Sequence, residues 1–326
     1  MPNIWEFLGL PANHRPKNKI VQLVKHWKEV PESKKQFPYF GQVKKDGVFA
    51  ALVVQGGKAA IFGRTGSQLT SCENYLKCYE CDSYPMFIYF GELVSSYPCS
   101  LEELSGVVNP ERVNTLDEKQ QAIADGIFIN YHDWSPLSTF ISGKTPHTYK
   151  ERHCELGYWL EHTPAYQDIL PYTVIHDEES RLEFSAACIA SGEEGAVFKR
   201  PDLPWVAGHK GFHQMKEVSQ VSYDLLCIGY EEGEGKYAGK VANLIFKWRD
   251  GQTIKAMLGK GWTHHDAEQM FKSCKHVESL CRLPQHTAVY PLGKVFKVKG
   301  LMDSSKGKIR LPKVAECRID KFEGDY

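Results

Sequence analysis

The chain has 326 residues, of which 42% are hydrophobic and 12% aromatic. This length and composition suffice for roughly two domains with packed cores, which excludes a disordered chain. The 40 basic and 40 acidic side chains cancel, so net charge alone indicates no polyanionic partner, although positive charge is concentrated in residues 15–45 and 294–313.

The sequence carries no pattern for membrane insertion or export. No apolar run approaches the roughly 20 residues that span a bilayer, and residues 1–15 lack the charged, apolar and small-residue regions of a secretory signal. We therefore expect a soluble, cytoplasmic protein without a membrane partner. The ten cysteines fit a reducing compartment.

Four of the cysteines form a cluster in the sequence, namely Cys72, Cys78, Cys81 and Cys99. Cys78 and Cys81 have the C-x-x-C spacing of many zinc sites, but the second half of the usual paired pattern is missing. We therefore expect reduced structural thiols here rather than a zinc site.

The first two thirds of the chain alternate strand and helix patterns. Apolar runs on either side of the Gly56–Gly57 pair predict a β-hairpin over residues 47–63. Two further strands, and two helices between them, are expected over residues 85–94, 125–134, 100–106 and 114–124.

Residues 148–162 have the pattern of an amphipathic helix, with Leu156, Trp159 and Leu160 on its apolar side. Short strand-like segments are expected after this helix, up to residues 195–200. This part of the chain is therefore expected to be α+β, with largely antiparallel sheets.

The pattern changes near residue 218. Four short strands are expected beyond this point, over residues 223–230, 242–248, 253–259 and 294–300. A helix is expected to begin at the capping-box pattern from Thr263 to Asp266. Short strands around one helix favour a small closed β-barrel of the OB type. We expect domains over residues 1–217 and 218–326.

One glycine-rich segment, Gly233–Ala238, matches a loose dinucleotide-binding fingerprint. That fingerprint requires a helix after the glycine turn, whereas a strand is expected here, so a Rossmann site is disfavoured. The sequence has no P-loop, H-E-x-x-H or G-x-S-x-G motif, which leaves Walker-type, zincin and hydrolase chemistry without support.

Several short motifs occur in a particular order. They are KKDG (44–47), GRTG (63–66), FGELV (90–94), FINYHDW (128–134), EEGAVFK (193–199), FHQMK (212–216) and IRLPKVAECRIDK (309–321). Each is weak alone, but in this order they resemble the covalent nucleotidyltransferase superfamily, specifically the small ATP-dependent DNA ligases of the bacteriophage type. The resemblance implies an ATP-grasp-like nucleotidyltransferase (adenylation) domain with antiparallel sheets, followed by an OB-fold β-barrel.

The resemblance implies that Lys44 is a nucleophile. A free lysine has a pKa near 10.4, so its surroundings must favour the neutral amine before it can attack. Lys44 would attack the α-phosphorus of ATP, form lysyl-AMP and release pyrophosphate. Asp46 would help to place the lysine, and Gly47 would permit a close backbone approach. The alternative is a charged surface turn.

The same resemblance assigns the divalent metal ion, Mg²⁺ or Mn²⁺, to Glu194 and Asp46. Magnesium prefers oxygen ligands and keeps several waters, so one or two carboxylates together with substrate phosphates suffice.

Four further side chains are implied in nucleotide binding. The amide oxygen of Gln42 would accept a hydrogen bond from the adenine amino group, and the imidazole of His132 would stack on the base. Arg64 and Glu92 would lie near the phosphate and the ribose.

Cations from later motifs complete the implied site. Lys199 and Lys216 would contact the phosphates, where charge accumulates during transfer, and Lys216 would be catalytic. Arg310, Asp320 and Lys321 in the last motif would orient the leaving pyrophosphate. Because this motif lies in the second domain, that domain would have to close over the nucleotide and reopen to admit DNA.

Nicked duplex DNA is the implied partner of a monomeric enzyme. Lys297, Lys299 and Lys306, together with Arg64, are expected to contact its phosphates. A ligase of the bacteriophage type would act in the cytoplasm of an infected bacterial cell.

Two positions depart from the common family pattern. Phe49 replaces an arginine two residues after the K-x-D-G glycine, and Gln214 replaces the first lysine of the motif that ends at Lys216. A catalytically impaired nucleic-acid-binding protein of the same fold therefore stays open as an alternative. An RNA ligase or a GTP-dependent capping-type nucleotidyltransferase is another alternative, because it shares the same lysine chemistry. NAD use is disfavoured, since the chain has no nicotinamide-binding domain and no four-cysteine zinc module.

Overall fold

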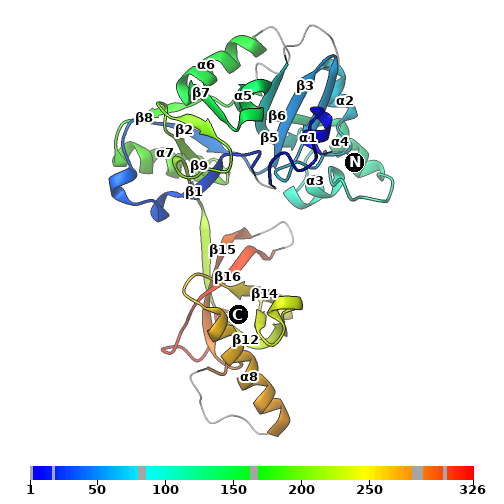
Figure 1. Ribbon diagram of the computed structural model, residues 1–326. Helices are drawn as coiled ribbons and strands as arrows, with labels where there is room; N and C mark the ends of the chain where they lie inside the picture. Colours follow the sequence, from blue (N-terminus) through cyan, green and yellow to red (C-terminus); the bar gives the residue numbers. More distant parts are fainter. Residues whose placement is uncertain (1–2, 17–18, 80–85, 162–167, 281–288, 304–306) are drawn as a thin grey trace. The chain divides into compact units, whose positions relative to one another are not determined.

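A computed structural model describes residues 3–16, 19–79, 86–161, 168–280, 289–303 and 307–326 (Figure 1). The chain divides into two compact units, Met1–Val218 and Ser219–Tyr326. Among the helices that the structure describes, none is both long and apolar enough to cross a membrane.

The first unit contains a four-stranded antiparallel sheet, in the order β4-β3-β5-β6. Its strands are β3 (Val48–Gln55), β4 (Lys58–Phe62), β5 (Phe87–Ser95) and β6 (Ile127–Pro136). These bounds confirm the predicted hairpin and the two strands after it. β3 reads as an unbroken apolar run because both of its faces are buried, with Leu52 in one core cluster and Val53 in the other.

Helices cover both faces of this sheet. One core cluster lies under α2 (Glu73–Leu76), α3 (Leu101–Val107), α4 (Glu118–Asp125) and α6 (Tyr149–Leu160). The other lies under α1 (Ile4–Phe7) and α5 (Leu137–Ser142). Helices α3, α4 and α6 were predicted, and their N-termini are fixed by capping boxes.

A second sheet in the first unit has the order β1-β11-β9-β2-β8. Its strands are β1 (Leu23–His26), β2 (Tyr39–Lys44), β8 (Thr173–Ile175), β9 (Gly195–Lys199) and β11 (Lys210–Val218). Only β1 and β11 pair in parallel among these described strands. One face packs on α7 (Glu178–Ala190) through a cluster that includes Phe198 and Met215. A separate two-stranded sheet joins β7 (Lys144–Thr148) and β10 (Pro204–Val206).

The second unit is a closed barrel in the order β12-β13-β14-β16-β15. Its strands are β12 (Gln220–Glu232), β13 (Val241–Lys247), β14 (Thr253–Leu258), β15 (Val295–Asp303) and β16 (Ile309–Cys317). The accompanying helix, α8 (His264–Leu280), begins as predicted, since the Asp266 carboxylate accepts from the Thr263 N–H at 2.7 Å. The predicted barrel is therefore confirmed.

Two expectations need correction, and one strand was not predicted. The region between α6 and β9 holds the 13-residue helix α7, where only strand-like segments were expected. Trp159 is 36% exposed on α6 and contacts Phe87 edge-on, so it lies at the margin of the apolar face rather than within it. The last motif forms β16, which was not predicted as a strand.

The cysteine cluster shows no sign of a metal site in the described part of the chain. Cys72 is buried and Cys99 is partly buried, whereas Cys78 is exposed and its thiol donates to the Tyr75 carbonyl oxygen at 3.2 Å. Cys81 lies outside the described residues. No group of three or more His, Cys, Asp or Glu side chains that could hold a metal occurs among the described residues.

Candidate active site

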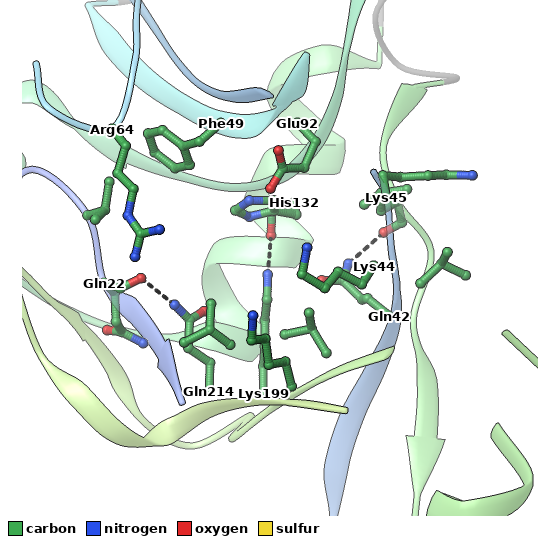
Figure 2. A pocket seen from close by; sticks show the side chains of 16 residues that line it. Gln22, Gln42, Lys44, Lys45, Phe49, Arg64, Glu92, His132, Lys199 and Gln214 are labelled. Carbon is green, nitrogen blue, oxygen red and sulfur yellow. Dashed lines mark hydrogen bonds between the residues drawn. The ribbon is translucent and has the colours of Figure 1, made fainter. Parts of the chain in front are cut away.

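A cavity of about 200 Å³ lies between the two sheets of the first unit (Figure 2). One wall comes from β1, β2, β9 and β11, and the other from β3, β5, β6 and the turn after β4. Its lining includes these residues predicted for nucleotide binding: Gln42, Lys44, Arg64, Glu92, His132, Lys199 and Lys216. Residues from distant parts of the sequence thus meet in one pocket.

Lys44 ends β2, directly opposite Gly195, the first residue of β9. This register brings the Lys44 ammonium to the Glu194 carboxylate, to which it donates a hydrogen bond. The neighbouring Lys45 makes an equivalent ion pair with Glu193. The two lysines of the KKDG motif therefore face the two glutamates of the EEG motif.

Gly47 and Asp46 follow Lys44 in the loop before β3. A Cβ atom on Gly47 would lie 2.7 Å from the Leu93 carbonyl oxygen, so only glycine allows β5 to approach so closely. This approach brings Glu92 to the cavity. Asp46 is exposed and is not among the residues that line the cavity.

The carboxyl group of Glu92 lies close to the charges of Lys44, Glu194 and Asp46. Its pKa is raised to about 7, chiefly by burial and also by the charges of Glu194 and Asp46, while the charges of Lys44 and Arg64 lower it. A carboxyl group in this position is easily neutralised by a proton or by another cation.

These carboxylates fit a magnesium or manganese ion that is completed by a substrate. Glu194 and Asp46 supply hard oxygen ligands, which these ions prefer. They form no complete protein cage among the described residues, and Mg²⁺ usually takes one or two carboxylates together with phosphate oxygens and water. The donor set is therefore compatible with the predicted metal in the presence of a phosphate ligand.

Three lysine side chains place positive charge in the cavity. Burial lowers the pKa of Lys199 to about 7, and its ammonium donates to the His132 carbonyl oxygen at 3.3 Å (Figure 2). The pKa of Lys216 is also lowered, first by burial and then by the charge of Lys44. Because the cavity crowds cations together, an anionic ligand would stabilise them.

The two atypical positions also line the cavity. Phe49 lies near Arg64 (Figure 2). Gln214 projects from the same face of β11 as Lys216, two residues away, and donates to the Gln22 carbonyl oxygen at 2.5 Å. Its amide is thus tied to the β1 side of the pocket.

Comparison with known proteins shows similarity to DNA ligases. Residues 232–318 match the family model of the DNA ligase OB-like domain. A probable DNA ligase of Streptomyces avermitilis is 27% identical over 222 residues, which are 67% of this chain and 42% of that protein. One of Kineococcus radiotolerans is 36% identical over 91 residues, which are 28% of this chain and 18% of that protein. The chain spans less than half the length of these curated relatives.

Three solved structures resemble the whole chain. A chain named Pmar-Lig_PreS3 has a TM-score of 0.72 and 17% identity, and the match covers 91% of this chain and 67% of that chain. A Lig E DNA ligase has a TM-score of 0.65 and 14% identity, with 91% and 98% covered. The predicted resemblance to DNA ligases is confirmed. The ATP-dependent DNA ligase of bacteriophage T7, in complex with ATP, has a TM-score of 0.50 and 16% identity, with 94% and 99% covered.

A buried ion pair that sequence analysis did not predict lies beside the cavity. Arg152 on α6 donates to both oxygens of Asp133, at 2.7 and 2.8 Å, and is 2% exposed. Asp133 follows His132 on β6. Nothing in the sequence singles out Arg152, because it is one of several charged residues on α6.

Gln42 is held by a second group of residues that sequence analysis missed. Its Nε2 donates to the Leu170 carbonyl oxygen at 2.8 Å, and its Oε1 accepts from the Tyr149 hydroxyl at 2.8 Å. Tyr149 also accepts from Lys199 at 3.2 Å. Tyr149 and Arg152 lie three residues apart, on one face of α6.

The three lysines that were predicted to contact DNA belong to the second unit. Lys299 is exposed on β15. Lys297, which was predicted as a DNA contact, is half-buried and ion-paired with Glu316. Lys306 lies outside the described residues.

Residues of the last motif make ion pairs within the barrel. Asp320 accepts from Arg318 at 2.7 Å, and Lys321 donates to Asp224 at 2.5 Å. Arg310 is half-buried on β16.

Proposed function

We propose that this chain is an ATP-dependent DNA ligase that seals nicks with 5′-phosphate and 3′-hydroxyl ends through lysyl-AMP and DNA-adenylate intermediates. The observation that carries the proposal is the ion pair between Lys44 and Glu194 at a cavity that also holds Arg64 and Lys216. A lysine nucleophile, a metal-binding carboxylate and cations for phosphates are the groups that adenylation requires.

In the first step, the Lys44 amine attacks the α-phosphorus of ATP. A P–N bond forms, and the P–O bond to the β-phosphate breaks, so pyrophosphate leaves. Lys199 and Lys216, which line the same cavity, stabilise the negative charge that develops on the phosphoryl oxygens. The T7 ligase of similar fold is ATP-dependent and was solved with ATP, which supports ATP as the nucleotide.

Glu194 and Asp46 are the proposed ligands of Mg²⁺ or Mn²⁺. When bound, the ion would neutralise charge on the phosphate oxygens. One oxygen of the Glu194 carboxylate accepts a hydrogen bond from Lys44. A cation held by Glu194 would therefore lie close to the Lys44 ammonium and would favour its neutral form.

In the later steps, AMP passes from Lys44 to the 5′-phosphate at the nick, and the 3′-hydroxyl then displaces AMP. The proposed partner is nicked duplex DNA, bound by a monomer. Support comes from the DNA ligase OB-like match over residues 232–318 and from the structural similarity to a Lig E ligase that was studied for DNA binding. Exposed Lys299 and the cavity residue Arg64 are proposed phosphate contacts.

Nucleotide labelling tests the proposal. The full chain is incubated with ATP or GTP labelled at the α-phosphate, or with NAD labelled in its AMP moiety, and Mg²⁺, and is then run on a denaturing gel. We expect label from ATP only, and none on Lys44→Ala. Label from GTP would instead support a capping-type enzyme. Absence of label from all three would favour a binding protein of the same fold.

A further inference from the structure

The guanidinium of Arg64 reaches into the cavity without a hydrogen-bond or ion-pair partner in the part of the chain that the structure describes (Figure 2). Lys44 and Lys199 are different, because each donates a hydrogen bond to a neighbouring group. The place of the Arg64 charge in the cavity therefore depends on the backbone turn that carries this residue.

Arg64 lies in a short loop that follows β4. The Gly63 N–H donates to the Ser67 carbonyl oxygen at 2.9 Å, and the Gly66 N–H donates to the Gly63 carbonyl oxygen at 2.9 Å. Gly66 has a φ of +85°, which is typical of the last residue in a three-residue hairpin loop. Arg64 itself is exposed at the tip, so contacts at the base of the loop determine where the tip lies.

The N-terminal helix α1 holds one side of this base. The Ile4 N–H donates to the Gly66 carbonyl oxygen at 2.9 Å, and Asn3 faces Ser67 in an isolated antiparallel bridge. The Ile4 side chain is buried. A Cβ atom on Gly66 would lie 3.2 Å from Cγ2 of Ile4, so the helix packs directly on the loop.

Aromatic and cationic contacts anchor α1 in turn. A helix of one turn is not stable alone, so α1 needs such support. The buried Trp5 ring stacks on Phe140 of α5, with 5.4 Å between the ring centroids. The Arg15 guanidinium lies 4.5 Å from the centroid of the Trp5 ring and donates to the Phe140 carbonyl oxygen at 2.6 Å. The loop of Arg64 is thus connected through α1 to the core of the first unit.

The N–H group of Ile4 is well suited to this contact. Ile4 is the first residue of α1, and the N–H groups of the first turn have no acceptor within a helix. The Asn3 side chain accepts from the N–H groups of Trp5 and Glu6. The Ile4 N–H can therefore bind Gly66 without loss of a hydrogen bond inside the helix.

We propose that α1 positions Arg64 for binding of a phosphate group, with Ile4 as the positioning residue, because its N–H holds the loop that directs the guanidinium into the cavity. This role rests on the proposed function in one respect, since that function places a nucleotide phosphate within reach of Arg64. Ile4 acts through Gly66 and Arg64 and does not itself touch the nucleotide.

A matched pair of substitutions isolates the hydrogen bond. Ile4→Pro and Ile4→Ala both remove the buried isoleucine side chain, but only proline also removes the N–H. Proline is favoured at the first position of a helix. The extended backbone of Asn3, with a ψ of 170°, suits a residue that precedes proline. The two variants therefore differ chiefly in the bond to Gly66.

The test measures binding of AMP to the full chain by calorimetry, so that it does not depend on catalysis. Ile4→Pro should bind AMP about three- to tenfold more weakly than Ile4→Ala, which is part of the value of one hydrogen bond to a charged group. When each is combined with Arg64→Ala, the two variants should bind AMP equally, because no guanidinium is left to position. A difference that persists without Arg64 would show that Ile4 acts through the fold and would overturn the proposal.

A second pair of variants decides the question if Ile4→Pro does not fold. Asn3→Ala removes the acceptor that caps α1, whereas Asn3→Asp keeps one. Asn3→Ala should weaken AMP binding only when Arg64 is present, and Asn3→Asp should retain the affinity of wild type. Equal affinities of these two variants would contradict a positioning role for α1.

Other results would also overturn the positioning role: no binding of AMP to wild type, equal affinities of folded Ile4→Pro and Ile4→Ala, or an affinity of Arg64→Ala equal to that of wild type. Labelling with ATP tests the proposed function separately. Label on Lys44 without coupling between Ile4 and Arg64 would leave the ligase function intact and remove the positioning role. Coupling without label would leave the positioning role intact and remove the ligase function.

Discussion

The Lys44 ammonium donates a hydrogen bond to the carboxylate of Glu194, so the proposed nucleophile and the proposed metal ligand form an ion pair. An ammonium group has no lone pair for attack. The pair must therefore separate, and Lys44 must lose a proton, before a nucleotide can be transferred.

Replacing Lys44 by alanine should abolish lysine adenylation and the sealing of an ordinary nick. The variant should still seal a nick that already carries a 5′-adenylate, because the lysine is consumed only in the first step. Gel assays of both substrates measure this, with Lys45→Ala, which removes the adjacent ion pair with Glu193, as the control that retains adenylation. Sealing of an ordinary nick by Lys44→Ala would refute the assignment.

Glu194→Gln should reduce adenylation by at least about 100-fold at every magnesium concentration, as expected for loss of a group that acts on the transferring phosphate. Glu193→Gln is the matched control, because Glu193 pairs with Lys45 instead. Initial rates are measured across a titration of Mg²⁺. Rates of Glu194→Gln equal to those of wild type would exclude it as a metal ligand.

Asp133→Ala should lower the free energy of unfolding of the chain by about 3–5 kcal/mol, because it leaves the Arg152 guanidinium buried without its carboxylate. Glu268→Ala breaks an exposed pair with Lys272 and should cost less than about 1 kcal/mol. Denaturant unfolding compares the two variants. Equal, small losses would contradict a structural role for the buried pair.

Lys199 should make stability depend on pH. Its pKa is about 7 when folded, below the ordinary value of lysine, so the unfolded chain binds more protons between about pH 7 and 10. Stability attributable to this residue should rise with pH across that window, by at most about 1.4 kcal/mol per pH unit, and should be flat below it.

Lys199→Met isolates this contribution, because it removes the titrating group and keeps a long side chain. Unfolding free energies of wild type and variant, measured at about pH 6, 7.5 and 9, should differ by an amount that changes above pH 7. Parallel pH profiles would show that the buried lysine does not titrate in this range.

Lys299→Glu should weaken binding of a nicked duplex and reduce the slope of log affinity against log salt by about one. Lys299 is exposed on β15, so the barrel should stay folded. Lys58→Glu, an exposed change on β4 of the other unit, is the control. Equal affinities and salt slopes for Lys299→Glu and wild type would remove this lysine from the DNA contacts.

Helices and strands could be predicted from the sequence where the buried side chains are apolar, because they then show a regular apolar pattern. The hairpin of β3 and β4 was found because apolar runs flank a glycine pair. Helix α7 was missed because its inner face buries Arg181 and Ser185, while Leu182 is 52% exposed on the outside. At these three positions of α7 the polar side chains are buried and the apolar one is exposed, which is the opposite of the usual amphipathic pattern.

The candidate site was likewise predicted only in part from the sequence. The order of the motifs assigned Lys44, Glu92 and Lys199 to one nucleotide site, and all three line the same cavity in the structure. It did not predict the bond between Gln42 and Tyr149, because two residues separated by 107 positions meet only through the packing of α6 against the strands. Pairs of this kind have no local sequence signal.

The register of β2 against β9 also decides which lysine can be labelled. Side chains alternate along a strand, so a slip by one residue would exchange the places of Lys44 and Lys45. Gly195 fixes the position of β9 against β11, since a Cβ atom there would lie 2.2 Å from the Glu217 carbonyl oxygen and its φ is +149°. Because β2 pairs with the other edge of β9, a displaced β9 would also displace the strand position opposite Lys44. Gly195→Ala should therefore disturb this part of the sheet and lower the adenylation of Lys44, although the glycine carries no reactive group.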